Sequence, residues 1–187
     1  MRFSVNKMVK MGVLCSLAII LMIIVRFPII PTATFLEYEP SDVPILVGAF
    51  MFGPVAGLFM TVVVSFIQAI TVSASSGFVG FLMHAIATGT LVFVAGLIYK
   101  KVHNFKGAII ALVAGSLSMT AIMIPLNLII DPVLYKMPLD AVIKLILPAF
   151  LPFNLAKAGI NSVIVASVYK PIAIFLRATG NEIKYNH

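Results

Sequence analysis

Long uncharged apolar runs constrain this chain more than any other feature. No Asp, Glu, Lys or Arg occurs from Val43 to Ala74. A helix of about 20 apolar residues crosses the hydrocarbon core of a bilayer, so runs of this kind predict membrane spans. The composition agrees, because 61% of the 187 residues are hydrophobic and only 10% are charged, against about 25% charged in soluble domains. We therefore expect an integral membrane protein and exclude a soluble enzyme.

Turn and charge signals divide the apolar sequence into six spans. The pair Gly53-Pro54 interrupts the run that begins at Val43, because such a pair ends one helix and starts another. The first run is longer than the apolar part of a signal peptide and lacks a cleavage motif, which favours a retained span. We expect an all-α bundle in a single transmembrane domain, residues 1–187. The expected spans are about 11–30, 43–52, 54–72, 78–98, 107–130 and 148–176.

The lysine and arginine residues indicate the orientation of the spans. With the N-terminus inside, the inner segments carry nine basic residues against three on the outer segments, which hold five of the six acids. We therefore expect both termini in the cytoplasm and a multi-pass protein of the cell membrane. The net charge of +7 then reports topology and requires no nucleic-acid partner.

Polar residues inside the expected spans are few and form no catalytic pattern. None of them is an Asp or a Glu, which argues against a proton relay. His84 has no second metal ligand near it in the sequence, and Cys15 is the lone cysteine, so no metal site is expected. No phosphate-binding G-x-x-x-x-G-K-[ST] motif occurs. We expect no enzyme and no cofactor, interpret His84 as an interfacial residue, and leave Gln68 open between helix packing and a pocket.

The sixth expected span carries the most informative polar face. Asn154, Lys157 and Asn161 follow each other at spacings of three and four, which places them on one side of a helix. That side belongs to the outer half of the span, and Asn127 lies at a matching depth in the fifth. In one interpretation Lys157 extends to the interface and the asparagines bond neighbouring helices. We favour the other interpretation, a polar wall of an outward-facing pocket for a ring-shaped polar ligand.

Two stretches resemble a known family. Residues Glu37 to Gly57 read EYEPSDVPILVGAFMFGPVAG, which resembles the first outer loop and second span of the S components of energy-coupling factor (ECF) vitamin transporters. The stretch PFNLAK that ends at Lys157, with Ser162 and Tyr169-Lys170 downstream, is similar to the sixth span of the riboflavin-specific members. The resemblance covers essentially the whole chain in length, span number and topology.

The resemblance implies a bacterial subunit that captures riboflavin from outside and has no transport power of its own. It would depend on a transmembrane coupling protein and two ABC-type ATPases of an ECF module. The loop 31–42 would cover the pocket as a lid. The implied ligand-binding residues are Asn154, Lys157, Asn127, Asn161, Glu37, Tyr38 and Asp42. The implied contact with the coupling protein uses small residues of the first span, here Gly12 and Ser16.

Three alternatives stay open at this point. An S component for another water-soluble vitamin, such as thiamine, would keep the architecture, although a cationic ligand prefers carboxylates or an aromatic cage over Lys157. An intramembrane enzyme is disfavoured because no catalytic constellation is present. A channel is disfavoured because no filter motif occurs and a polar stripe appears in only one span.

Overall fold

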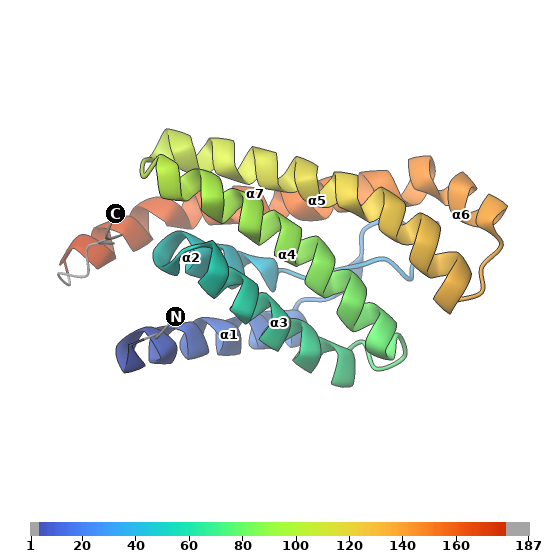
Figure 1. Cartoon of the computed structure of the whole chain (residues 1–187), viewed down its shortest axis with the longest axis horizontal. Helices are drawn as coiled ribbons and strands as arrows, with labels where there is room; N and C mark the ends of the chain where they lie inside the picture. The colour runs from blue at the N-terminus through green and yellow to red at the C-terminus, as the bar shows by residue number, and fades with distance from the viewer. Residues whose placement is uncertain (1–3, 179–187) are drawn as a thin grey trace.

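The computed structural model describes residues 4–178 and is an all-helical bundle apart from one two-stranded ribbon (Figure 1). The expected helical class is therefore confirmed. Its helices, in order, are α1 (Val5–Ile24), α2 (Asp42–Phe52), α3 (Pro54–Ile70), α4 (Gly77–Lys101), α5 (Phe105–Leu134), α6 (Leu139–Leu145), the π-helical η1 (Ile146–Phe150) and α7 (Leu151–Ala178).

Four helical stretches are long and apolar enough to cross a membrane. They are α1, α4, α5 and the stretch Leu139–Pro171 that contains α6, η1 and most of α7. The helices α2 and α3 are apolar but shorter. They meet at Gly53, whose φ of 93° suits a residue without Cβ. Pro54 then opens α3 at the position where a missing N–H costs no helical bond.

The first helix differs from the expected span 11–30. It begins six residues earlier, where the Ser4 hydroxyl accepts a bond from the backbone N–H of Lys7. It ends at Ile24, where Val25 already has extended backbone, and Pro28 further on could not continue a helix. Phe27–Pro28 instead forms strand β1, which pairs antiparallel with β2 (Glu37–Tyr38). The two strands bring the segment after α1 back toward the bundle.

Helix α4 lies between α3 and α5 and packs extensively against both. Small residues permit the close approach. A Cβ on Gly96 would lie 2.9 Å from the Pro54 Cα, and one on Gly115 would lie 2.8 Å from the Leu91 carbonyl oxygen. Large side chains such as Met60 fill the core between the helices without exposure to solvent.

The two ends of the bundle differ in what they carry. Helix α1 begins and α7 ends at the same end, which also holds the α4–α5 turn (Figure 1). Lys100, Lys101 and Lys106 flank that turn. The α3–α4 turn and α6 lie at the opposite end (Figure 1), which we call the far end.

Candidate functional site

A cavity of about 460 Å³ lies between α3, α4, α5, α7 and the loop that follows β1. Cavities that hold a small molecule or cofactor measure roughly 300–1,000 Å³. The loop contributes Phe35, Leu36, Glu37 and Glu39 to the lining, and the ring of Phe35 packs edge-on against Phe150. The loop 31–42 thus forms one wall of the cavity.

Much of the cavity lining is apolar and consists of flexible methionine and flat phenylalanine side chains. Met83 and Ala87 of α4 face it from one side, and Met119 and Met123 of α5 line it as well. Phe153 adds an aromatic surface from α7. Methionine and phenylalanine adapt well to a flat, apolar ring. The cavity is therefore suited to a ligand with a large planar part.

Helix α5 changes character along the side that lines the cavity. Met119, Met123, Asn127 and Asp131 all line it, and their spacing of four places them on one helical face. The two methionines are nearer the middle of the bundle, and the two polar residues are nearer the far end, where α5 ends at Leu134. A ligand that lies along this face would contact an apolar surface near the middle of the bundle and a polar surface nearer the far end.

Two asparagines in the lining keep an amide oxygen available. The amide nitrogen of Asn127 donates to the Met123 carbonyl at 2.7 Å, and that of Asn154 donates to the Phe150 carbonyl at 2.7 Å. Within residues 4–178 neither side-chain oxygen has a hydrogen-bond partner. Because each nitrogen is held by the residue one turn earlier, the two oxygens have fixed positions as acceptors for a ligand.

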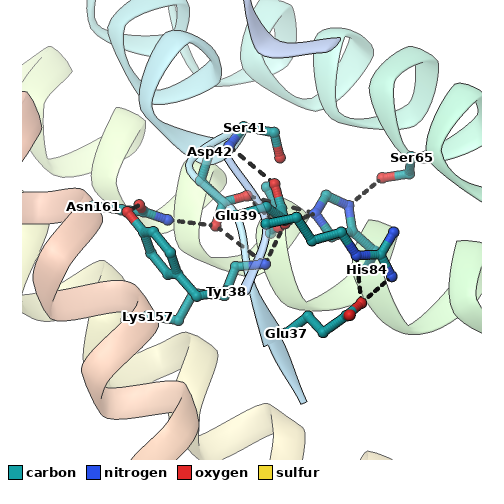
Figure 2. Close-up of polar contacts among 11 residues, drawn as sticks. Glu37, Tyr38, Glu39, Ser41, Asp42, Ser65, His84, Lys157 and Asn161 are labelled. Atoms are coloured by element: carbon teal, nitrogen blue, oxygen red, sulfur yellow. Dashed lines mark hydrogen bonds and ion pairs between the residues drawn. The ribbon is translucent and has the colours of Figure 1, made fainter. Parts of the chain in front are cut away.

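A cluster of four charged or ionisable side chains lies beside the cavity, and we call Glu39, Asp42, His84 and Lys157 the ion cluster. The Lys157 ammonium is 2.5 Å from Glu39 Oε1, and His84 Nε2 is 3.4 Å from the same oxygen. Asp42 lies 3.9 Å from Lys157 and 3.7 Å from His84. Figure 2 shows Lys157 entering from one side and His84, backed by Ser65, from the other.

Further hydrogen bonds complete the environment of Asp42. Asn161 donates to one carboxylate oxygen at 3.0 Å, and Thr88 donates to the other at 2.8 Å. The Tyr38 hydroxyl in turn donates to the Asn161 amide oxygen at 2.9 Å (Figure 2). Asp42 also stands in the first turn of α2, where the helix dipole favours a negative charge. This buried carboxylate is therefore fully compensated by the protein.

The loop residue Glu39 is held in its charged form. Burial would raise the pKa of its carboxyl, but the Lys157 ammonium and the His84 ring outweigh burial and hold that pKa below its usual range. The backbone N–H of Ser41 also donates to Glu39 at 3.0 Å. The ionised Glu39 therefore fastens the end of the loop to α7.

A second ion pair lies where the loop meets α1 and the α3–α4 turn. Arg26 pairs with Glu37 of β2 and also donates to the Val72 carbonyl. Arg26 and Glu37 line the cavity together with Ser73 and Ser76 of the turn. Both partners retain partial exposure, so this pair belongs to the rim of the cavity.

The structure separates the predicted site residues into three groups. Four line the cavity: Asn127, Asn154, Lys157 and Glu37. Three lie behind it in or against the ion cluster: Asn161, Tyr38 and Asp42. Two lie on α1, on a face that is exposed: Gly12 and Ser16.

Several expectations about polar residues were wrong. Asp42 is 0% exposed and Asp131 lies within α5, so carboxylates do occur inside the bundle. His84 lines the cavity, although the sequence favoured an interfacial position. Its partners Glu39 and Asp42 are far away along the chain, and only their mutual spacing of three could have been noticed. Gln68, which the sequence leaves open between helix packing and a pocket, lines the cavity as well.

His84 has no second ligand group near it in the sequence, but two carboxylates lie near it in space. Oxygen and nitrogen atoms of Glu39, Asp42 and His84 lie within 4.8 Å of one another, a grouping that metals use. In this protein, however, the Lys157 ammonium already contacts Glu39. The carboxylates therefore have a counter-ion from the chain itself, and the arrangement fits a lysine better than a metal ion.

Comparison with known proteins gives consistent matches over most of the chain. The family described as "ECF transporter, substrate-specific component" matches residues 6–169. The chain is 27% identical over 174 residues to the riboflavin transporter FmnP of Bacillus subtilis (strain 168), covering 89% of this chain and 91% of that protein. It is 28% identical over 178 residues to the riboflavin transporter RibU of Staphylococcus aureus (strain TCH60), covering 92% and 93%.

A solved structure has the same fold. Its title is "Structure and mechanism of the S component of a bacterial ECF transporter". The two structures align with a TM-score of 0.78 and 28% sequence identity, covering 91% of this chain and 97% of the other. The bundle described above is therefore the fold of an S component.

Proposed function

This chain belongs to the ECF transporter family of substrate-specific components, and we propose that it captures riboflavin for uptake into the cell. The observation that carries the proposal is the cavity, which combines apolar walls with fixed amide acceptors. The names of the relatives, both riboflavin transporters, support the same substrate. Membership in a transporter family argues against the enzyme and channel alternatives.

The chemistry of a flavin matches the lining. Its dimethylbenzene side is flat and apolar and would lie against Met119, Met123 and Phe153. Its pyrimidine edge carries an N–H group and carbonyl oxygens. The oxygen of Asn127 or Asn154 can accept from this N–H, because neither oxygen has a hydrogen-bond partner among the described residues.

Lys157 is proposed to serve the ligand and the loop together. It lines the cavity and holds Glu39 at 2.5 Å. An ammonium has three N–H donors, so donors remain for a carbonyl of the ligand. We propose that Glu37 contacts the ligand from the rim, and that Asn161, Tyr38 and Asp42 act by holding the ion cluster in place.

The proposed topology is six membrane spans with both termini in the cytoplasm of a bacterial cell. The common end of α1 and α7, with Lys100 and Lys101 at the α4–α5 turn (Figure 1), supports it through the positive-inside rule. The far end then faces outward. The short α2 is buried over most of its length, which suits a helix surrounded by protein rather than by lipid.

Transport is proposed to require partners. No phosphate-binding loop occurs in the sequence, so the energy would come from two ABC-type ATPases joined through a transmembrane coupling protein. The exposed face of α1 at Gly12 and Ser16 is the proposed contact. The Ser16 hydroxyl bonds the Gly12 carbonyl, and space around Gly12 is open, so another helix can approach closely.

The substrate proposal is tested by fluorescence titration of detergent-purified protein. We expect riboflavin fluorescence to be quenched with a dissociation constant in the nanomolar range, and thiamine to give no competition at a large excess. A heat-denatured sample is the control, because equal quenching by denatured protein would show that the quenching is nonspecific. Riboflavin as the substrate would be contradicted if the protein left riboflavin fluorescence unchanged, or if thiamine displaced bound riboflavin.

The coupling proposal is tested by Gly12→Leu, with Gly159→Leu as the matched control. A Cβ added at either glycine meets no heavy atom of a neighbouring element within 4 Å, so both variants should fold. We expect Gly12→Leu to abolish riboflavin uptake in cells while the purified protein binds riboflavin as the wild type does. Normal uptake by Gly12→Leu, or equal loss in both variants, would contradict the proposed contact.

A further inference from the structure

Asp131 is a buried carboxylate without a side-chain partner among the residues that the structure describes. Its side chain lines the cavity and the residue is only 4% exposed. Among the side chains that the structure describes, none bonds or pairs with this carboxylate. Its backbone carbonyl does have a structural role, because the N–H groups of Tyr135 and Met137 both donate to it. The backbone is therefore satisfied, whereas the side chain is available.

The position of Asp131 makes this carboxylate unfavourable for the folded protein alone. It lies in the last turn of α5, where no basic residue compensates it. The helix dipole disfavours a negative charge at that end, and burial removes water from the carboxylate. A side chain that costs stability and lines a cavity is typical of a binding group.

The charges around the cavity also single out Asp131. Arg26 is paired with Glu37, and Lys157 is paired with Glu39. Within the described lining, Asp131 is thus the one charged group without an opposite charge beside it. An ionised carboxylate has acceptor oxygens only, so a ligand group that bonds to Asp131 must be a hydrogen-bond donor.

We propose that Asp131 binds the hydroxyl groups of a polyol chain on the ligand. This inference rests on the proposed function, in which the polyol is the ribityl chain of riboflavin. The order along α5 supports it, because Met119 and Met123 suit the ring and Asp131 lies beyond them toward the far end. Gln68, which also lines the cavity, has a buried side-chain oxygen with no partner in the described residues and adds a second acceptor for hydroxyls.

The test compares riboflavin with lumiflavin, which has the same ring but a methyl group in place of the ribityl chain. Asp131→Ala should weaken riboflavin binding about tenfold to a hundredfold, since hydrogen bonds to a charged group are among the stronger ones. Lumiflavin affinity should stay within about twofold, because a methyl group makes no hydrogen bond to lose. Asp140→Asn, on an exposed residue of α6, is the charge-matched control and should leave both affinities unchanged.

A second variant and a second measurement keep the proposal testable if Asp131→Ala folds poorly. Asp131→Asn has nearly the same shape and should lower the preference for riboflavin over lumiflavin. The ligand-free Asp131→Asn protein should also unfold at a higher temperature than the wild type, because an uncompensated charge is removed.

The outcomes separate this inference from the proposed function. Equal weakening of both flavins, or unchanged riboflavin affinity in Asp131→Ala, would overturn the polyol site while riboflavin remained the substrate. A lower unfolding temperature for ligand-free Asp131→Asn would assign the residue a structural role and would also overturn it. If the wild-type protein did not bind riboflavin, the proposed function itself would be contradicted.

Discussion

Two groups of buried polar side chains lie next to each other in this bundle and differ in whether the protein itself satisfies their hydrogen bonds. In the ion cluster of Glu39, Asp42, His84 and Lys157, every member has a partner within the protein. In the second group, which we call the open wall and define as Asn127, Asp131 and Asn154, oxygen atoms remain without a partner in the described residues. Buried polar groups are normally satisfied. The open wall is therefore the place where a ligand is expected to supply the missing bonds.

The two carboxylates Asp42 and Asp131 show the difference most clearly. Both are nearly inaccessible to solvent. Asp42 stands at the start of a helix and receives bonds from Thr88 and Asn161. Asp131 stands near the end of a helix and receives none at its side chain in the described structure. The same chemical group thus stabilises the fold in one position and is available for binding in the other.

The largest effect should come from breaking the ion cluster. Lys157→Met leaves Glu39 and Asp42 buried without their nearest cation. Removal of one partner of a buried ion pair costs about 3–5 kcal/mol, so we expect a large drop in the unfolding temperature and loss of riboflavin binding. The chain contains no tryptophan, so unfolding in detergent is followed by thermal aggregation.

The matched control for that variant is the double substitution Glu39→Gln with Lys157→Met. It removes both charges of the closest pair, so much of the lost stability should return while riboflavin binding stays weak. If Lys157→Met alone were as stable as the wild type, the cluster would not be the structural element that its contacts indicate.

An intermediate effect should come from the open wall. Asn154→Ala removes an available acceptor and is expected to weaken riboflavin binding about tenfold, the value of a hydrogen bond of about 1.4 kcal/mol. Its ligand-free unfolding temperature should change little. Fluorescence titration and thermal unfolding of the same preparation measure both quantities.

Asn161→Ala on the same face of α7 is the matched comparison for Asn154→Ala. Asn161 is 0% exposed and bonds both Asp42 and Tyr38. Its loss should lower the free energy of unfolding by about 1–3 kcal/mol, because buried groups lose their partner. If Asn154→Ala and Asn161→Ala had the same effects on binding and stability, the open wall and the environment of the ion cluster would not differ in role.

The smallest effect should come from the rim. Arg26 and Glu37 pair at the cavity edge, where partial exposure to water limits the contribution of an ion pair to about 1 kcal/mol or less. We expect Glu37→Gln to speed riboflavin dissociation by no more than about fivefold. Stopped-flow measurements at low and high salt would check this, and the difference from the wild type should shrink as salt screens the pair.

Local signals in the sequence were sufficient for part of the site. The spacing of Asn154 and Lys157 placed them on one helical face, and both line the cavity. Asn161 shares that face but lies further along α7, where Tyr38 and Asp42 meet it. Periodicity reports which side of a helix a residue occupies and carries no information about which neighbour covers that side.

The sequence by itself determined the helical class, because long apolar runs leave a backbone in lipid no better alternative than a helix, and the break at Gly53-Pro54 follows from local conformational limits. Only the tertiary structure decided which polar groups are paired. Lys157 of α7 meets the loop residue Glu39 across 118 positions of the chain, and His84 joins them from α4. Such contacts depend on how helices pack in space, so no local pattern could have distinguished the satisfied Asp42 from the available Asp131.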